Sequence, residues 1–168
     1  MPDEAGTVLQ IDPVTRTVTQ FGSFPTGYGG WLSCAVAGNG MIYGIPYAAT
    51  RVLVIDPDTQ TVTTIGEGHI GGGSGRWIGA VFAANGLILG IPTASNSIIV
   101  IDPASNSNSN SVSNFSSRAV TSVHVLAPTG VASFAWYGGV KANDGVIYGI
   151  PFGADTVLEI GVPVCFPS

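Results

Sequence analysis

One unit is repeated along this chain, and the repeat limits the folds that the chain can adopt. Three segments align without gaps and share a tryptophan, an Asn-Gly or Asp-Gly pair and a Gly-Ile-Pro sequence: residues 31–57, 77–103 and 136–162. The first two segments are identical at 13 of 27 positions, and Trp77 follows Trp31 by 46 residues. The chain opens with a partial copy, TVLQIDPVTRTVTQFG, which matches VLVIDPDTQTVTTIG. Such a chain is expected to fold as similar units that pack one against the next.

Each unit predicts four short strands joined by tight turns. Asn85-Gly86 is a strong signal for a two-residue hairpin, and Pro92 ends a strand because proline cannot donate to a β-ladder. The expected strands of the second unit are residues 77–83, 87–91 and 98–101, and the fourth strand is clearest in the first unit, at 61–65. Four antiparallel strands in about 46 residues is the size of a propeller blade. The sequence therefore predicts an all-β protein, a β-propeller of four-stranded antiparallel blades.

The blades are distributed unevenly, so an incomplete ring is expected. With strands named a to d from the axis outward, the chain predicts a part-blade (5–22), a blade (31–66), a blade with an altered fourth strand (77–117) and a part-blade (136–162). A polar insertion, 104–135, separates the last two and contains SNSNSNSVSNFSS, which predicts a surface loop.

Natural propellers close with roughly four to eight blades, and an open set leaves strand edges and apolar faces uncovered. Self-association, a larger assembly or a longer parent chain are the alternatives that would cover them. We expect contacts at residues 5–22 and 136–162, with Val157 and Ile160 taking part.

The composition excludes several classes of function. Only 9% of the residues are charged, the net charge is −5, and five Lys and Arg are too few for a nucleic-acid surface. No apolar run approaches the roughly 18 residues that span a membrane. Cys34 and Cys165 allow one disulfide or two free thiols but no thiolate zinc site, and we expect no metal and no cofactor. Residues 1–4 show no signal-peptide pattern, which predicts either an intracellular protein or a processed or truncated start.

The loops that connect strands d to a and b to c are expected on one face of the blades. They would gather the candidate binding residues Trp31, Tyr47, Arg76, Trp77, Trp136 and Phe152. Aromatic rings at a rim can stack on sugars or on a partner's side chains. The alternative is that each tryptophan packs between neighbouring blades, where large rings bury much area.

Two other repeated residue types have simpler structural explanations. Gly44, Gly90 and Gly149 interrupt the second strand at a fixed position, which is typical of close approach by a neighbouring blade. Asp12, Asp56 and Asp102 each precede a turn, where an aspartate accepts backbone N–H groups, and this explains them better than a cation site does.

The blades resemble known propeller repeats. NDGVIYGIPFGADTVLEI is similar to blades of the streptogramin-lyase-like propellers, and VLVIDPDTQTVTTI is similar to the YVTN-type repeats of bacterial surface-layer propellers. The lyase resemblance would imply a histidine general base and a metal, but His69 and His124 lie in no matching motif. We therefore expect a non-catalytic module for protein–protein interaction or assembly. A glycan-binding, lectin-like propeller and a propeller lyase or hydrolase are the alternatives.

Overall fold

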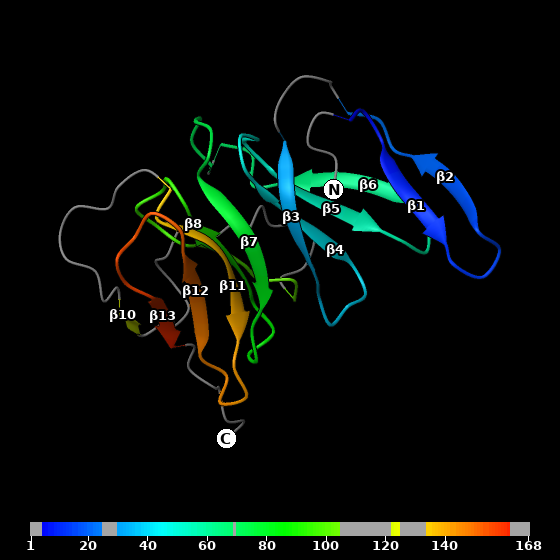
Figure 1. Cartoon of the computed structure of the whole chain (residues 1–168). Coiled ribbons are helices and arrows are strands. Elements are labelled where there is room, and N and C mark those ends of the chain that lie inside the picture. The colour runs from blue at the N-terminus through cyan, green and yellow to red at the C-terminus, as the bar shows by residue number, and fades with distance from the viewer. Residues whose placement is uncertain (1–4, 25–29, 69, 105–121, 125–133, 162–168) are drawn as a thin grey trace.

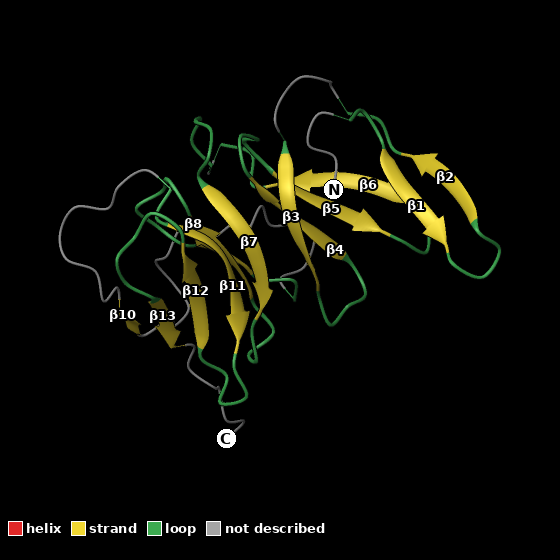
Figure 2. Ribbon diagram, viewed as in Figure 1, coloured by secondary structure: helices red, strands yellow, loops and turns green. Residues whose placement is uncertain are grey.

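The structure is a computed structural model that describes residues 5–24, 30–68, 70–104, 122–124 and 134–161. Figures 1 and 2 show antiparallel sheets and no helix in these residues, so no described helix is available to cross a membrane. The strands are β1 (Val8–Asp12), β2 (Thr17–Phe21), β3 (Trp31–Val36), β4 (Ile42–Pro46), β5 (Val52–Asp56), β6 (Thr61–Ile65), β7 (Trp77–Phe82), β8 (Ile88–Pro92), β9 (Ile99–Ile101), β10 (Ser122–His124), β11 (Trp136–Lys141), β12 (Ile147–Pro151) and β13 (Leu158–Gly161).

The described strands form four sheets, which we number blades 1 to 4 along the chain. Blade 1 is the hairpin β1-β2, blade 2 is β3-β4-β5-β6, blade 3 is β7-β8-β9 and blade 4 is β10-β13-β12-β11. Consecutive strands pair antiparallel through short turns. Gly86 has the predicted positive φ, +86°, and the side chain of Asn85 accepts the N–H of Leu87 at 3.2 Å. The predicted two-residue hairpin is wrong, however, because the N–H of Gly86 donates to the carbonyl of Ala83 at 3.1 Å and Asn85 has no positive φ. The loop has three residues, with Gly86 in the left-handed position that follows the turn.

Blade 4 differs from the sequence prediction of a three-stranded part-blade. Its outer strand is β10, which precedes the rest of the blade in the chain and pairs antiparallel with β13. The predicted altered fourth strand of blade 3 and the polar run 105–117 lie outside the described residues. Within the insertion, the described strand therefore completes the blade that follows and not the blade that precedes.

The turns after the third strand follow the predicted aspartate chemistry. Oδ1 of Asp56 accepts the N–H groups of Asp58 at 2.9 Å and Thr59 at 3.2 Å, and Oδ1 of Asp12 makes the equivalent pair of bonds. Asp102 accepts the N–H of Ala104 at 2.9 Å. These carboxylates fix the turns.

The blades pack face to face, with the inner strands β3, β7 and β11 side by side (Figure 1). One apolar core lies between blades 2 and 3 and includes Ile45 and Ile99, and a second lies between blades 3 and 4 and includes Ile91 and Leu158. This arrangement is an incomplete ring of a β-propeller.

Glycines permit the closest approach between inner strands. A Cβ placed on Gly79, which has a φ of +94°, would lie 2.4 Å from Cα of Gly138. The N–H of Gly79 also donates to Oγ of Ser33 at 2.9 Å, which links β7 to β3. At this point β7 and β11 are so close that there is no space for a side chain between their backbones.

Candidate functional site

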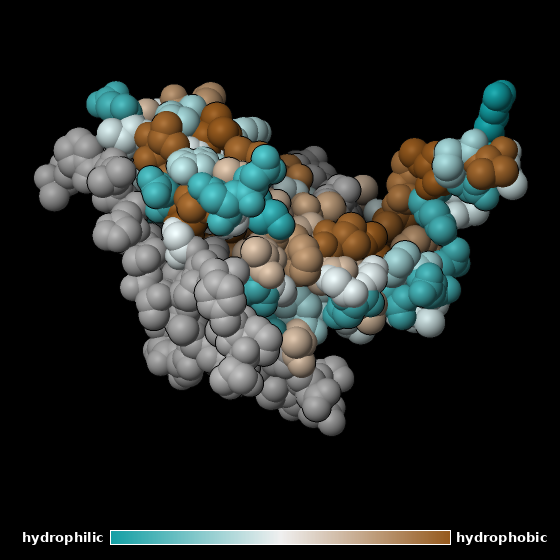
Figure 3. Space-filling model, turned by 90° about the horizontal axis from the view of Figure 1, so that it is seen from below, coloured by the Kyte–Doolittle hydropathy of each residue, from teal (hydrophilic) through white to brown (hydrophobic). Residues whose placement is uncertain are grey.

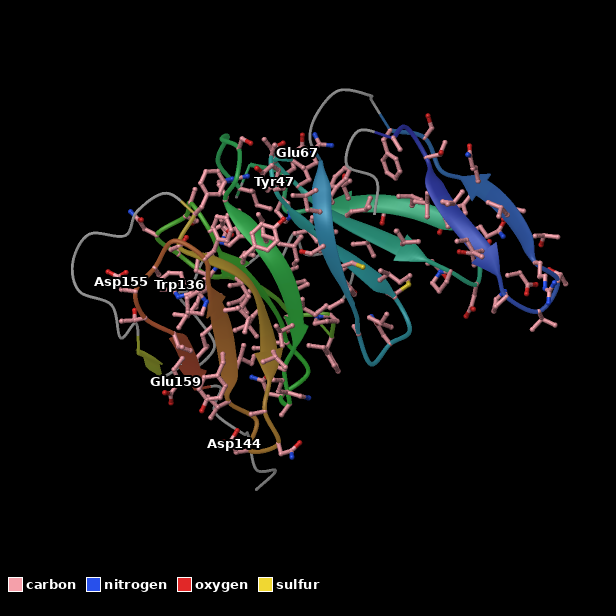
Figure 4. All side chains as sticks on the ribbon, in the orientation of Figure 1. Tyr47, Glu67, Trp136, Asp144, Asp155 and Glu159 are labelled. Atoms are coloured by element: carbon pink, nitrogen blue, oxygen red, sulfur yellow. The ribbon has the colours of Figure 1, made fainter. Side chains whose placement is uncertain are left out.

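A chain of backbone hydrogen bonds runs along one end of blades 2, 3 and 4. In each of these blades the residue after the Gly-Ile-Pro proline donates its N–H to the carbonyl of the residue before the tryptophan. In blades 2 and 3 the carbonyl of that same residue also accepts an N–H from the next blade. The bonds are Tyr47 N to Gly30 O (3.0 Å), Arg76 N to Tyr47 O (3.3 Å), Thr93 N to Arg76 O (2.8 Å), Ala135 N to Thr93 O (3.0 Å) and Phe152 N to Ala135 O (2.9 Å). The loop end of the blades is therefore a fixed surface. Figure 4 shows Tyr47 at this end and Asp144 at the opposite, hairpin end.

The tryptophans of the candidate site are anchored within their own blades. Each indole N–H donates to a backbone carbonyl 20 residues later: Trp31 to Arg51 at 2.8 Å, Trp77 to Ser97 at 2.6 Å and Trp136 to Thr156 at 2.9 Å. Trp77 and Trp136 are also buried, whereas Trp31 is partly exposed beside Phe24, with ring centroids 5.6 Å apart. The geometry favours the packing interpretation for Trp77 and Trp136.

Arg76 links the loops of blades 2 and 3. Its guanidinium lies 4.6 Å from the centre of the Trp77 ring, and Nη2 donates to the carbonyl of Ala49 at 2.8 Å. Burial lowers the pKa of this guanidinium from its ordinary value. The side chain is thus committed to contacts within the protein, because an arginine stacked on an aromatic ring gains both packing and cation–π attraction.

An exposed aromatic pair lies on blade 4. Phe152 is 70% exposed, and its ring centroid is 5.6 Å from that of Tyr137, which is also exposed. Tyr137 was not among the candidates because Leu32 and Ile78, the residues at the same position in the other blades, are aliphatic. The six predicted site residues thus lie at the loop end of blades 2, 3 and 4, and Phe152 is the most accessible of them.

The outer face of blade 1 exposes side chains that other blades bury. Leu9 and Ile11 of β1 are 56% and 64% exposed, whereas Leu53 and Ile55, at the same repeat positions in β5, are 0% and 3% exposed. Blade 1 contacts blade 2 by its other side, since Gln60 donates to the side chain of Gln10 at 2.7 Å. We call the open side the N face, defined by Leu9, Ile11, Val18 and Gln20.

The outer face of blade 4 is open in the same way. Ile150 is 48% exposed, although Ile45 and Ile91 at the same repeat position are fully buried. Val157 and Val140 are exposed too, whereas their equivalents Val52 and Val81 are buried. We call this side the C face, defined by Val140, Ile150, Val157 and Glu159.

The two residues expected to form contacts at the end of the chain lie on different sides of blade 4. Val157 belongs to the C face, but Ile160 is fully buried against blade 3, so its predicted exposure is wrong. Propeller blades are covered on both sides. Both sides of a strand are therefore apolar, and alternation along the strand does not tell which side will be left open.

Figure 3 shows a further open surface, distinct from the N face and the C face. A hollow separates the right-hand part of the molecule, which holds β1 and β2 in Figure 1, from the rest, and apolar side chains line it. Leu32 and Val36 of β3 are exposed apolar residues too. A contiguous apolar surface of this kind typically marks a protein interface.

Few groups with catalytic or ligating chemistry come together in the described residues. Within the ranges given above, no three His, Cys, Asp or Glu side chains form a group that could hold a metal ion. Cys34 is exposed and unbonded, while Cys165 and His69 lie outside the described residues, as does the side chain of His124.

No family model and no curated protein matches this chain. Its fold is similar to solved β-propellers. A virginiamycin B lyase from Staphylococcus aureus matches with a TM-score of 0.60 at 12% identity, over 97% of this chain and 51% of the lyase. A streptogramin B lyase matches with a TM-score of 0.62 at 14% identity, over 97% and 50%.

The extracellular domain of a protein described as a hybrid two-component system of B. thetaiotaomicron matches with a TM-score of 0.60 at 15% identity, over 98% of this chain and 19% of that one. The resemblance to streptogramin-lyase-like propellers is thus confirmed at the level of the fold. This chain spans about half the length of the solved lyases.

Proposed function

We propose that this chain is a non-catalytic propeller module that binds protein through its two open blade faces. The observation that carries this proposal is the contrast between equivalent repeat positions. Ile45 and Ile91 are fully buried by the blade that follows, and Ile150 in the same position is 48% exposed. Because this repeat position is buried in the other two blades, we expect Ile150 to be buried by a partner when the protein is in its functional assembly.

Each face offers enough apolar surface to contribute to binding, but a single face alone is too small to bind a partner strongly. Full burial of a Val, Leu or Ile side chain contributes roughly 1.5–3 kcal/mol, so each half-exposed side chain on a face offers about 1 kcal/mol. Association opposes this with a loss of translational and rotational freedom of about 4–15 kcal/mol. A partner is therefore expected to cover more than one small patch.

A photo-crosslinking amino acid at position 150 tests this function. In extract of the source organism, the chain labelled at Ile150 is expected to give a covalent protein adduct on illumination. The control carries the same label at Asp144, an exposed residue in the hairpin turn at the far end of the same blade. Adducts at both positions, or at neither, would contradict the proposal.

Glycan binding is a second candidate, supported by the exposed ring pair of Tyr137 and Phe152. Paired aromatic rings with one open side offer a stacking surface for a sugar. The support is narrower than for protein binding, because Trp77 and Trp136, the residues that first suggested a lectin, are buried and hydrogen-bonded within their blades.

A further inference from the structure

We infer that the partner of both faces is a second copy of this chain, arranged head to tail. The C face of one copy packs on the N face of the second copy, and the N face of the first packs on the C face of the second. The inference rests on the proposed function and specifies its partner. It follows from how the internal blades already pack on one another.

Each internal contact places an isoleucine in a hollow left by a glycine. A Cβ on Gly90 would lie 2.8 Å from the side chain of Ile45 in the preceding blade and 2.4 Å from that of Ile99. The next contact repeats this geometry, because a Cβ on Gly149 would lie 3.4 Å from Ile91 and 3.0 Å from Leu158. The isoleucine of one blade thus packs beside the third strand of the following blade.

The two open faces carry the apolar side chains of this contact that no described blade covers. Blade 1 has only the third and fourth strands of a blade, so its N face offers the counterpart of Ile99 and Leu158 but none of Gly90 or Gly149. Ile150 is the third isoleucine of the series and meets no following blade among the described residues. Leu9 occupies the position of Ile99 and Leu158, and its side chain points away from blade 2. In the head-to-tail arrangement, Ile150 of one copy packs beside Leu9 of the second copy.

The four described blades suit a closed pair. They match about half of each solved lyase propeller, so two sets of such blades match the extent of one propeller. Head-to-tail contacts generate a closed ring when the rotations between successive copies add up to a full turn. Two copies related by a twofold axis meet this condition, because each is rotated by half a turn from the other. A closed pair contains two contacts between a C face and an N face, and we call each contact a joint. Both joints form for a single loss of translational freedom, which compensates for the small area of each face.

Polar groups on the faces are compatible with this contact. Glu159 stands on the C face where Val54 and Val100 stand in the other blades, and Gln20 stands on the N face opposite Leu9 in the hairpin. An amide can donate to a carboxylate, so this pairing would not bury two like charges.

Sedimentation equilibrium of the full 168-residue chain over a wide range of concentration tests the pair. The expected species at high concentration has twice the 17.1 kDa of one chain and no larger species follows it. A monomer at every concentration would overturn the inference, and so would open polymers larger than the pair.

Charged substitutions test the head-to-tail arrangement. Ile150→Asp and Leu9→Asp are each expected to weaken association by about 100-fold or more, because each leaves an unpaired charge in both joints. Val14→Asp is the matched control, since Val14 is exposed in the turn between β1 and β2 and lies on neither face. Circular dichroism of each variant verifies that the blades stay folded.

Mixing the two variants distinguishes head-to-tail packing from packing of like faces. A pair of one Ile150→Asp chain and one Leu9→Asp chain has both charges in one joint and neither in the other. The mixture is expected to associate at least tenfold more tightly than either variant alone. Association unaffected by Leu9→Asp, or a mixture no tighter than its components, would overturn the arrangement.

These results also separate the inference from the proposed function. The purified chain could sediment as a monomer and still give an adduct at Ile150 with a different protein in extract. That result would refute the second copy as the partner while supporting the interaction module. A monomer that gives no adduct would refute both.

Discussion

Replacing Gly79 with alanine tests how closely the inner strands of blades 3 and 4 approach. The new Cβ would lie 2.4 Å from Cα of Gly138, 3.2 Å from its carbonyl carbon and 3.3 Å from its nitrogen. Carbon atoms in good contact are about 3.5–4.0 Å apart, so the two backbones would have to separate by roughly 1 Å or more. Such overpacking typically destabilises a core by about 1–3 kcal/mol.

Gly138→Ala is a matched control for this experiment. Gly138 occupies the same repeat position and has a φ of +85°, close to the +94° of Gly79, but a Cβ there meets no atom within 4 Å. Both substitutions therefore carry the left-handed backbone cost of roughly 1–2 kcal/mol, and only Gly79→Ala adds the clash. We expect a loss of about 2–5 kcal/mol for Gly79→Ala against about 1–2 kcal/mol for Gly138→Ala.

Urea unfolding at equal protein concentration, followed by tryptophan fluorescence and extrapolated linearly, measures the difference. Equal destabilisation by the two substitutions would refute the packing distance between β7 and β11. A larger loss for Gly138→Ala would mean that an unseen neighbour covers the open side of blade 4.

Two further predictions concern the anchoring of single blades. Trp136→Phe removes the indole N–H of a buried ring and leaves the carbonyl of Thr156 without this donor, so it is expected to lower the free energy of unfolding by about 1–3 kcal/mol. Trp31→Phe makes the same change at a partly exposed ring and is expected to cost less, because water reaches the freed carbonyl of Arg51 more easily. Chemical unfolding followed by circular dichroism compares the two variants, and equal losses would contradict the argument. Hydrogen bonds from the side chain and backbone of Thr59 hold the pKa of Asp56 below the ordinary value of 3.8, so the stabilisation by its carboxylate is fully present above pH 3.8 and is lost as the pH falls through the lower folded-state pKa. Asp56→Asn keeps an acceptor oxygen but does not titrate, so its urea midpoint is expected to fall less than that of the native chain between pH 6 and pH 3; parallel curves would show that this turn does not contribute to the pH dependence.

The parts of the fold that were predicted correctly depend on local chemistry. Asn85-Gly86 marks the position of a hairpin through two adjacent residues, although the loop has three residues and not the two that were predicted. Asp56 defines a turn through its own side chain and the next three residues. The spacing between tryptophans then identified the blade. The fourth strand of blade 4 was missed because β10 comes shortly after the polar run 105–117 and pairs with a strand far along the chain, so neither a turn nor a repeat marks it.

The site was harder to predict because it depends on neighbours. The sequence identifies the tryptophans as repeated, but only the structure shows that each indole N–H is used by a carbonyl 20 residues later. The spacing of 20 residues between each tryptophan and its carbonyl partner is the same in all three repeats, and this was the one sequence feature that could have indicated the bond. Ile150 and Ile160 are both apolar residues of blade 4, and only the arrangement of blades shows that Ile150 is open and Ile160 covered.

The pairing of β10 with β13 sets an order for folding during synthesis. Most blade strands pair with the strand that immediately follows them, so blade 2 has all its partners once residue 65 has been made. Blade 4 is different, because Ser122 pairs with Gly161 and the chain between them must be complete before the outer strand can dock. A growing chain therefore holds an unpaired β10 segment while the ribosome adds about forty residues, as counted from that pairing. Of the four described blades, blade 4 is the last to form.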